Sequence, residues 1–372
     1  MFSRNIKIGD KYIGDDHPCM IVAEMSGNHN GSYEKAVEIV HAAAEAGADA
    51  IKLQTYTADT ITIDSDKPWF KISDSDLWSG RTLYDLYKEA YTPWEWQPRL
   101  KEEAEKLGLI CFSSPFDPTS VDFLEEMNVP AYKIASYEIN DIPLIRKVAA
   151  LHKPVIFATG IAFEEDIQRA LVTCLDEGND QVMLLKCVSA YPTPYEDVNL
   201  RVMPTLAEEH GCLIGLSDHT PGSVVPVGSI VLGGKMIEKH LTLDKNGGGV
   251  DDSFSMEPSE FAAMVRDVRI MEKALGSDIY KLTQKQKEEH KFSRSLFAVK
   301  DIKAGEIITT ENVRSVRPGI GMHTMHYDEI LGRPATQDIE KGTPIRPELI
   351  DEVKWDELLY GGEASPDAKW GQ

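Results

Sequence analysis

The chain has 372 residues and a formal net charge of −22 at pH 7. A length of this order suits a barrel of about 250 residues with a smaller module attached. The acidic balance argues against nucleic acid and against an anionic membrane as partners. No run approaches the roughly 18 apolar residues that cross a bilayer, and residues 1–10 lack a signal-peptide core, so we expect a cytoplasmic location.

Five cysteines are spread along the chain, and no two of them form a CxxC pair. An odd count with wide spacing argues against a disulfide framework and against a zinc–cysteine site. Most of them lie in apolar stretches, which is typical of buried thiols in a reducing compartment. They are Cys19, Cys111, Cys174, Cys187 and Cys212.

The first element expected is a β-hairpin in residues 7–18, with Gly9 and Asp10 at its turn. Eight apolar runs follow, separated mostly by helical patterns such as 33–46 and 164–177. Runs that do not alternate suit strands buried on both faces, so eight of them predict a (β/α)8 TIM barrel in the α/β class, with the hairpin capping its bottom. The runs are 20–24, 49–54, 109–113, 131–135, 154–158, 182–187, 212–216 and 236–241.

A doubly wound open sheet is the alternative to a closed barrel for such a pattern. No GxGxxG motif follows the first strand, which weakens a dinucleotide-binding interpretation. We therefore favour the barrel.

Three further segments depart from the barrel pattern. Residues 57–82 form a long polar and aromatic insertion, and loops of this length are usually functional or disordered. Residues 277–291 are strongly polar and predict a linker after a barrel domain of 1–276. Residues 292–352 alternate β-prone runs with turn signals, which predicts a compact β-rich domain. Residues 353–372 are expected to be a polar tail.

The ends of the expected strands carry lysines and small hydroxyl residues, where barrel active sites lie. A lone lysine on a strand is more often a surface residue. A converging set needs a partner, because buried charge is costly. Lysine supplies charge for phosphate or carboxylate and serine completes the hydrogen bonding, so the expected ligand is a small, doubly charged anion. The set is Lys52, Ser114, Lys133, Ser136, Lys186, Ser189 and Ser217.

Two histidines, His219 and His240, end the neighbouring seventh and eighth strands. Adjacent strands lie about 4.8 Å apart, so the two imidazoles can share one divalent ion. Each histidine alone is more often structural, but the pair beside Glu24 and Asp251 favours a metal site. Two nitrogen ligands leave positions open for Lewis-acid polarisation of a carbonyl. His29 is a weaker third candidate.

These residues fall in motifs that resemble the sialic acid synthase family, in the family's order and over nearly the whole chain. Its architecture is a barrel followed by a SAF (antifreeze-like) domain, which the resemblance implies for residues 292–352. The motifs are IVAEMSGNHNGS (21–32), AGADAIKLQTY (46–56), FSSPFD (112–117), VPAYKIAS (129–136), SAYPTPYED (189–197), GLSDHT (215–220), IEKHLTLD (237–244) and VRPGIG (316–321).

The resemblance implies an enzyme that joins phosphoenolpyruvate to the open-chain aldehyde of an acetamido sugar and releases phosphate. It implies a divalent metal, Mn²⁺ or Mg²⁺, held by His219 and His240. It implies Glu24 as the acid–base glutamate, with Tyr191 and Asp251 near substrate and metal. The implied phosphoenolpyruvate contacts are Lys52, Ser114, Lys133, Ser136, Ser189 and Ser217.

Arg317 matches the arginine that the family's C-terminal domain inserts into the partner subunit's site. The resemblance therefore implies a domain-swapped homodimer. Two positions depart from the family pattern. Ala158 stands where serine is common, so we assign no contact there, and Ser189 stands where N-acetylneuraminate synthases tend to carry asparagine.

Within the family, the segments 53–64, 83–96 and 184–192 are most similar to the branch that makes pseudaminic acid. The branches that make N-acetylneuraminate and legionaminic acid are the alternatives. The aromatic residues Trp69, Phe70 and Trp78 of the insertion are hypothesised to shield an apolar methyl group and a second acetamido group of the sugar.

Two rival functions remain open on the sequence. A synthase acting on a phosphorylated ketodeoxy sugar should need a second basic cluster, and none is evident. A non-catalytic, carbohydrate-associated barrel should have lost some of the converging residues, yet Glu24, Lys52, Lys133, His219 and His240 are all present.

Overall fold

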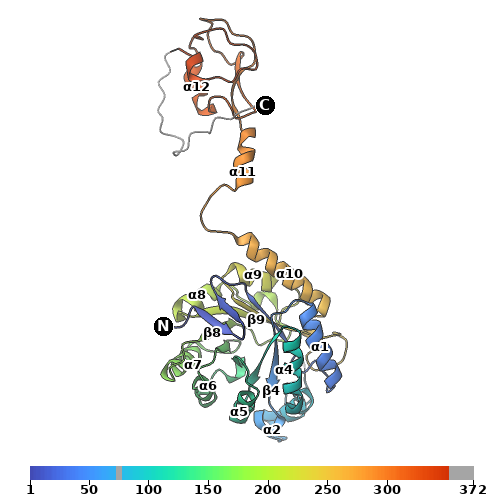
Figure 1. The fold of residues 1–372 in the computed structure, drawn as a ribbon. Helices are drawn as coiled ribbons and strands as arrows, with labels where there is room; N and C mark the ends of the chain where they lie inside the picture. The colour runs from blue at the N-terminus through green and yellow to red at the C-terminus, as the bar shows by residue number, and fades with distance from the viewer. Residues whose placement is uncertain (73–77, 352–372) are drawn as a thin grey trace. The chain divides into compact units, whose positions relative to one another are not determined.

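The computed structural model describes residues 1–72 and 78–351. The chain divides into two compact units, 1–276 and 277–372 (Figure 1). The polar tail expected at 353–372 and the last residue of the expected 292–352 domain lie outside the described residues. All five cysteines are free and buried, as the sequence predicts.

The first unit is a closed barrel of eight parallel strands, ordered so that the last strand pairs with the first. The expected barrel is confirmed, and each expected run lies within two residues of its strand. The strands are β3 (Met20–Glu24), β4 (Ala50–Thr55), β5 (Ile110–Pro115), β6 (Tyr132–Ile134), β7 (Val155–Ala158), β8 (Val182–Lys186), β9 (Leu213–Asp218) and β10 (Met236–His240).

Helices surround the barrel and pack against the outward side chains of its strands. Ile21 and Ile51 on the strands, for example, share one buried cluster with Ile39 of α1 and Phe261 of α10. Burying each such side chain contributes about 1.5–3 kcal/mol. The helices of this unit are α1 (Tyr33–Glu45), α2 (Ala58–Ile61), α3 (Leu83–Ala90), α4 (Gln97–Lys106), α5 (Pro118–Glu126), α6 (Ile142–Ala149), α7 (Glu164–Asp176), α8 (Val202–His210), α9 (Val224–Val231) and α10 (Pro258–Leu275).

A hairpin of β1 (Asn5–Ile8) and β2 (Lys11–Gly14) packs at the start of the barrel strands. Its buried residues Ile6, Ile8 and Ile13 join the inward residues that begin the strands, including Met20 and Ile110. Gly9 turns the hairpin with φ +61° and approaches Ile110 closely, so glycine suits both its conformation and its space. The hairpin thus closes the amino-terminal end of the barrel and leaves the opposite end for chemistry.

The second unit contains the antiparallel pair β11 (Ser295–Ala298) and β12 (Val313–Val316). Isolated bridges such as Ile302–Ile339 and Ala335–Ile350 extend this pairing, and Leu296, Ile308 and Ile345 are among the residues of its core. Its helices are α11 (Gln284–Glu289) and α12 (Tyr327–Ile330).

Short 3₁₀ turns complete the secondary structure. They are η1 (Pro68–Phe70), η2 (Trp94–Trp96), η3 (Ser136–Glu138), η4 (Tyr195–Asp197), η5 (Asp252–Phe254), η6 (His290–Phe292), η7 (Thr324–His326) and η8 (Pro347–Leu349). Across the described parts of both units, no helix has the length and apolar character needed to cross a membrane.

Candidate active site

The inward side chains of the barrel change from apolar to polar along the strands. Successive residues of a strand face opposite sides, so alternate positions point into the barrel. Met20 and Val22 at the start of β3 lie in the inward apolar cluster, and Glu24 is the next residue with the same orientation. The corresponding polar residues of the other strands are Lys52, Ser114, Lys133, Ser217, Glu238 and His240.

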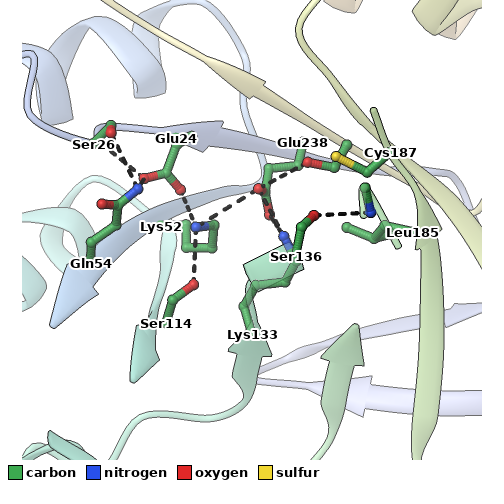
Figure 2. Close-up of polar contacts among 12 residues, drawn as sticks. Glu24, Ser26, Lys52, Gln54, Ser114, Lys133, Ser136, Leu185, Cys187 and Glu238 are labelled. Carbon is green, nitrogen blue, oxygen red and sulfur yellow. Dashed lines mark hydrogen bonds and ion pairs between the residues drawn. The ribbon is translucent and has the colours of Figure 1, made fainter. Parts of the chain in front are cut away.

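Two lysines and two glutamates form a buried network at this end (Figure 2). Lys133 Nζ donates to both carboxylate oxygens of Glu238 at 3.0 Å. Lys52 Nζ forms an ion pair with Glu24 and lies 3.8 Å from Glu238 Oε1. Each of the four side chains is at most 6% exposed. Equal numbers of opposite charges make this burial tolerable, since an isolated buried ion costs several kcal/mol.

The two glutamates differ in how readily they take a proton. Burial raises the pKa of the Glu24 carboxyl, although Lys52 opposes the shift. Burial also disfavours ionised Glu238, but Lys133 and Lys52 together outweigh it and lower the pKa of that carboxyl. A site with two carboxyls whose pKa values move apart can use one as a fixed charge and the other as a proton carrier. In this network the pKa of Glu24 is raised and that of Glu238 is lowered.

Hydroxyl groups surround the lysine network. Lys52 Nζ donates to Ser114 Oγ at 3.2 Å, and Ser217 Oγ donates to Glu238 Oε1 at 3.3 Å. Ser136 Oγ accepts a hydrogen bond of 3.0 Å from the Gly160 amide. A Cβ at position 160 would collide with both Ser136 Oγ and Ser189 Oγ, so glycine lets these hydroxyls gather there. Together they can complete the hydrogen bonds of a small anion held by the lysines.

A second chain of contacts links Glu24 to Asp251. Gln54 Nε2 donates to Glu24 Oε1 and to Ser26 Oγ, at 3.2 Å each. Ser26 Oγ in turn donates to the Asp251 carboxylate. Burial raises the pKa of Asp251. These contacts connect the carboxyl at the end of β3 with the loop that follows β10.

His219 and His240 face each other, with ring centroids 5.3 Å apart. His219 Nδ1 donates to the Val188 carbonyl at 2.9 Å. Burial lowers the pKa of this ring, but Cys187 and the Val188 carbonyl outweigh it and raise the pKa. The buried Nδ1 of His240 has no hydrogen-bond partner, and burial, reinforced by His219, holds the pKa of this ring well below its usual range. Two neighbouring imidazoles, one of which has a buried nitrogen without a partner, fit a shared divalent ion.

Within residues 1–72 and 78–351, no group of three or more His, Cys, Asp or Glu side chains is placed to hold a metal ion. The protein therefore offers two histidine nitrogens, and an ion there would need its remaining ligands from water or substrate.

Aromatic rings stand beside the histidines. Tyr191 packs against His219 with a centroid distance of 4.5 Å, and Phe254 lies 5.1 Å from Tyr191 and 5.2 Å from His240. Trp78, from the long insertion, lies 5.8 Å from Tyr191. The space next to the histidine pair is thus lined by carbon as well as by polar groups.

Some residues singled out in the sequence lie elsewhere. His29 is buried, and its Nε2 pairs with Thr92 Oγ at 3.1 Å while its ring packs on Trp96, so it serves the core rather than a metal. Lys186 donates to the Cys187 carbonyl and is not part of the lysine network. Trp69 is 70% exposed and separate from the aromatic rings. Arg317 directly follows β12 in the second unit and is exposed.

Two residues of the site were not assigned a role from the sequence. Glu238 precedes His240 by two residues, so strand alternation alone places both on the inner face. The charge of Glu238 on an apolar strand was a possible signal for a site residue. A glutamate beside an expected anion site is electrostatically unfavourable, however, unless it has a cationic partner, and that partner is Lys133. Phe254 lies in a loop after β10 and carries no comparable signal.

Comparison with known proteins extends this picture. A model of the NeuB family matches residues 39–280, and a model of the SAF domain matches residues 293–351. The pseudaminic acid synthase of Campylobacter jejuni is 46% identical over 331 residues, which are 89% of this chain and 96% of that protein. The N,N′-diacetyllegionaminic acid synthase of C. jejuni is 35% identical over 331 residues, covering 88% and 98%.

Among solved structures, an N-acetylneuraminic acid synthetase from Leptospira borgpetersenii matches with a TM-score of 0.69 and 31% identity. The match covers 77% of this chain and 95% of that one. Fold and site together define a barrel enzyme in which two buried lysines are paired with two glutamates and two histidines lie side by side. The chain belongs to the NeuB family and carries a SAF domain after its barrel.

Proposed function

We propose that this chain is a pseudaminic acid synthase, a transferase that joins phosphoenolpyruvate to 2,4-diacetamido-2,4,6-trideoxy-L-altrose and releases phosphate. The observation that carries the proposal is the pair of buried lysines, Lys52 and Lys133, among hydroxyls at the open end of the barrel. Identity of 46% to a pseudaminic acid synthase, against 35% to a legionaminic acid synthase, supports the choice of sugar. Synthesis of legionaminic acid or N-acetylneuraminate is the alternative.

Phosphoenolpyruvate would bind where the lysines meet the hydroxyls. Its phosphate and carboxylate offer anionic oxygens that can replace part of the contact each lysine makes with glutamate. The carboxylates hold Lys52 and Lys133 in position before the substrate arrives. The proposed contacts are Lys52, Ser114, Lys133, Ser136, Ser189 and Ser217.

His219 and His240 would hold Mn²⁺ or Mg²⁺, which when bound supplies Lewis-acid polarisation of the sugar aldehyde. The unpartnered Nδ1 of His240 supports this assignment. Asp251, held by Ser26, and Tyr191, packed on His219, would fix the sugar beside this pair.

The protein groups then divide the work of the reaction. Carbon 3 of phosphoenolpyruvate forms the new bond to the aldehyde carbon, the aldehyde oxygen takes a proton, and carbon 2 becomes electron-poor. Water adds at carbon 2 and loses a proton, and cleavage of the bond between carbon 2 and the bridging oxygen releases phosphate. Glu24 is the proposed carrier of the water proton, because burial raises the pKa of its carboxyl. Lys52 and Lys133 stabilise the anionic groups throughout.

Arg317 is proposed to complete the site of a partner subunit in a domain-swapped homodimer. Its exposure at the end of β12 supports a role in contacts outside its own unit. A cytoplasmic setting accompanies the proposal, since five free buried thiols suit a reducing compartment.

A stoichiometry measurement tests the proposed reaction. With phosphoenolpyruvate, Mn²⁺ and the altrose, the purified protein should release one phosphate for each nonulosonic acid formed. Phosphate release without formation of a sugar acid would contradict the proposal. So would a failure to consume phosphoenolpyruvate with any of three sugars: the altrose, the precursor of legionaminic acid and N-acetylmannosamine.

A further inference from the structure

Three aromatic residues from distant parts of the chain meet beside the histidine pair. Trp78 comes from the insertion after β4, Tyr191 from the loop after β8, and Phe254 from η5 after β10. We call Trp78, Tyr191 and Phe254 the aromatic cluster. The ring centroid of Tyr191 lies 5.8 Å from that of Trp78 and 5.1 Å from that of Phe254. Tyr191 packs against His219, and Phe254 packs against His240. This arrangement gives the site an apolar wall that the reaction chemistry itself does not require.

Trp78 is fixed in the cluster by a hydrogen bond as well as by packing. Its Nε1 donates to the Val250 carbonyl at 2.8 Å, which ties the insertion to the loop carrying Asp251 and Phe254. Trp69 of the same insertion is instead 70% exposed. Because the Trp78 N–H is already used, its ring offers a ligand only carbon.

The length of the sugar lets its far end reach this cluster. The aldehyde carbon must lie near His219 and His240 to be polarised by an ion held there. Five carbon–carbon bonds of about 1.5 Å carry an open six-carbon chain roughly 6 Å from its first atom to its last. Tyr191 is 4.5 Å from His219, and Trp78 is a further 5.8 Å from Tyr191. Carbons 5 and 6 are therefore far enough from the aldehyde carbon to lie against the rings of the aromatic cluster.

We propose that the aromatic cluster is the subsite for carbon 6 of the sugar, which is a methyl group in the 6-deoxy sugar. Trp78 is the residue that favours such a sugar over one that carries a hydroxyl on carbon 6. The inference rests on the proposed condensation with a 6-deoxy diacetamido sugar. A methyl group buries apolar surface against the rings. A hydroxyl group there would lose its hydrogen bonds to water and could not replace them with one from the indole N–H. Apolar subsites of this kind discriminate one small group by about tenfold or more.

The proposal is tested by binding and by turnover. The binding probe is the unreactive alcohol made by reducing the aldehyde of the 6-deoxy sugar, compared by calorimetry with the alcohol from N-acetylmannosamine. Trp78→Ala should weaken binding of the 6-deoxy alcohol about tenfold and leave the KM for phosphoenolpyruvate within twofold. Trp78→Phe, which keeps a ring but loses the N–H, should retain most of the preference. Trp69→Ala is the matched control in the same insertion and should bind as the unmodified chain does.

The outcomes separate this inference from the proposed function. If the unmodified chain prefers the 6-deoxy sugar and Trp78→Ala keeps that preference within twofold, the subsite assignment is wrong and the proposed function stands. If the unmodified chain turns over only N-acetylmannosamine, the proposed function fails first. Should Trp78→Ala lower the melting temperature sharply, Trp78→Leu, which keeps apolar volume without a ring, replaces it in the same comparison.

Discussion

At the scale of single residues, the site depends on charges that neutralise one another inside the barrel. Lys133 and Glu238 form a two-pronged contact at 3.0 Å, and Lys52 bridges Glu238 and Glu24. The positions of Lys52 and Lys133 on two of the expected strands were enough to predict that they lie together at one end of the barrel. The pairing with Glu238 could not be predicted, because it joins residues 105 positions apart and depends on how the barrel closes.

Removing one member of this network should affect stability and substrate use separately. Lys133→Met leaves Glu238 with Lys52 alone, so we expect the free energy of unfolding to fall by about 3 kcal/mol. The double variant Lys133→Met/Glu238→Gln removes both charges and should regain most of that stability in denaturant titrations. Both variants should lose at least about a hundredfold in kcat/KM for phosphoenolpyruvate. Recovery of activity in the double variant would show that the Lys133 charge does not hold the substrate.

The histidine pair gives a second prediction at this scale. His240→Ala should abolish measurable Mn²⁺ affinity and metal-dependent turnover, because a single imidazole remains. The melting temperature should change little, since His240 Nδ1 makes no hydrogen bond. His29→Asn is the control: it alters a buried histidine bound to Thr92 and should keep Mn²⁺ affinity. Full activity of chelated His240→Ala without added metal would rule out the metal role.

At the scale of elements, the strands were predictable and the loops were not. Eight apolar runs specify buried parallel strands, and the polar residues that follow them mark the active end. The insertion 57–82 was singled out by its length, yet the sequence did not distinguish Trp69 from Trp78. That distinction comes from the bond between Trp78 and Val250, which lies across 172 residues of sequence.

The hairpin provides a prediction for a single element. Ile8→Ala removes a fully buried side chain at the closed end of the barrel and should lower the free energy of unfolding by about 3 kcal/mol. KM values should not change, because the lysine network lies at the opposite ends of the strands. The neighbouring exposed substitution Lys7→Ala should stay within about 0.5 kcal/mol of the unmodified chain. An equal loss in both variants would mean that Ile8 does not contribute through burial.

At the scale of the whole molecule, the chain joins a complete barrel to a small second unit that carries Arg317. Composition and motifs were enough to predict both units. The role of Arg317 in the site of a partner subunit stays a prediction.

Mixed assemblies test the proposed contribution of Arg317. Arg317→Ala and Glu24→Ala should each be nearly inactive alone. If the arginine acts in the partner subunit's site, a co-expressed equal mixture should regain about a quarter of the unmodified activity, because half of the dimers are mixed and each has one intact site. No recovery, with mixed dimers verified by differential tags, would contradict exchange between subunits.

The central claim is that this barrel condenses phosphoenolpyruvate with a 6-deoxy diacetamido sugar. It is tested most directly by kcat/KM for three acceptors under identical Mn²⁺ and phosphoenolpyruvate: the diacetamido altrose, the legionaminic precursor and N-acetylmannosamine. We predict that the altrose is preferred by at least about tenfold over each of the others. A preference for N-acetylmannosamine would contradict the account.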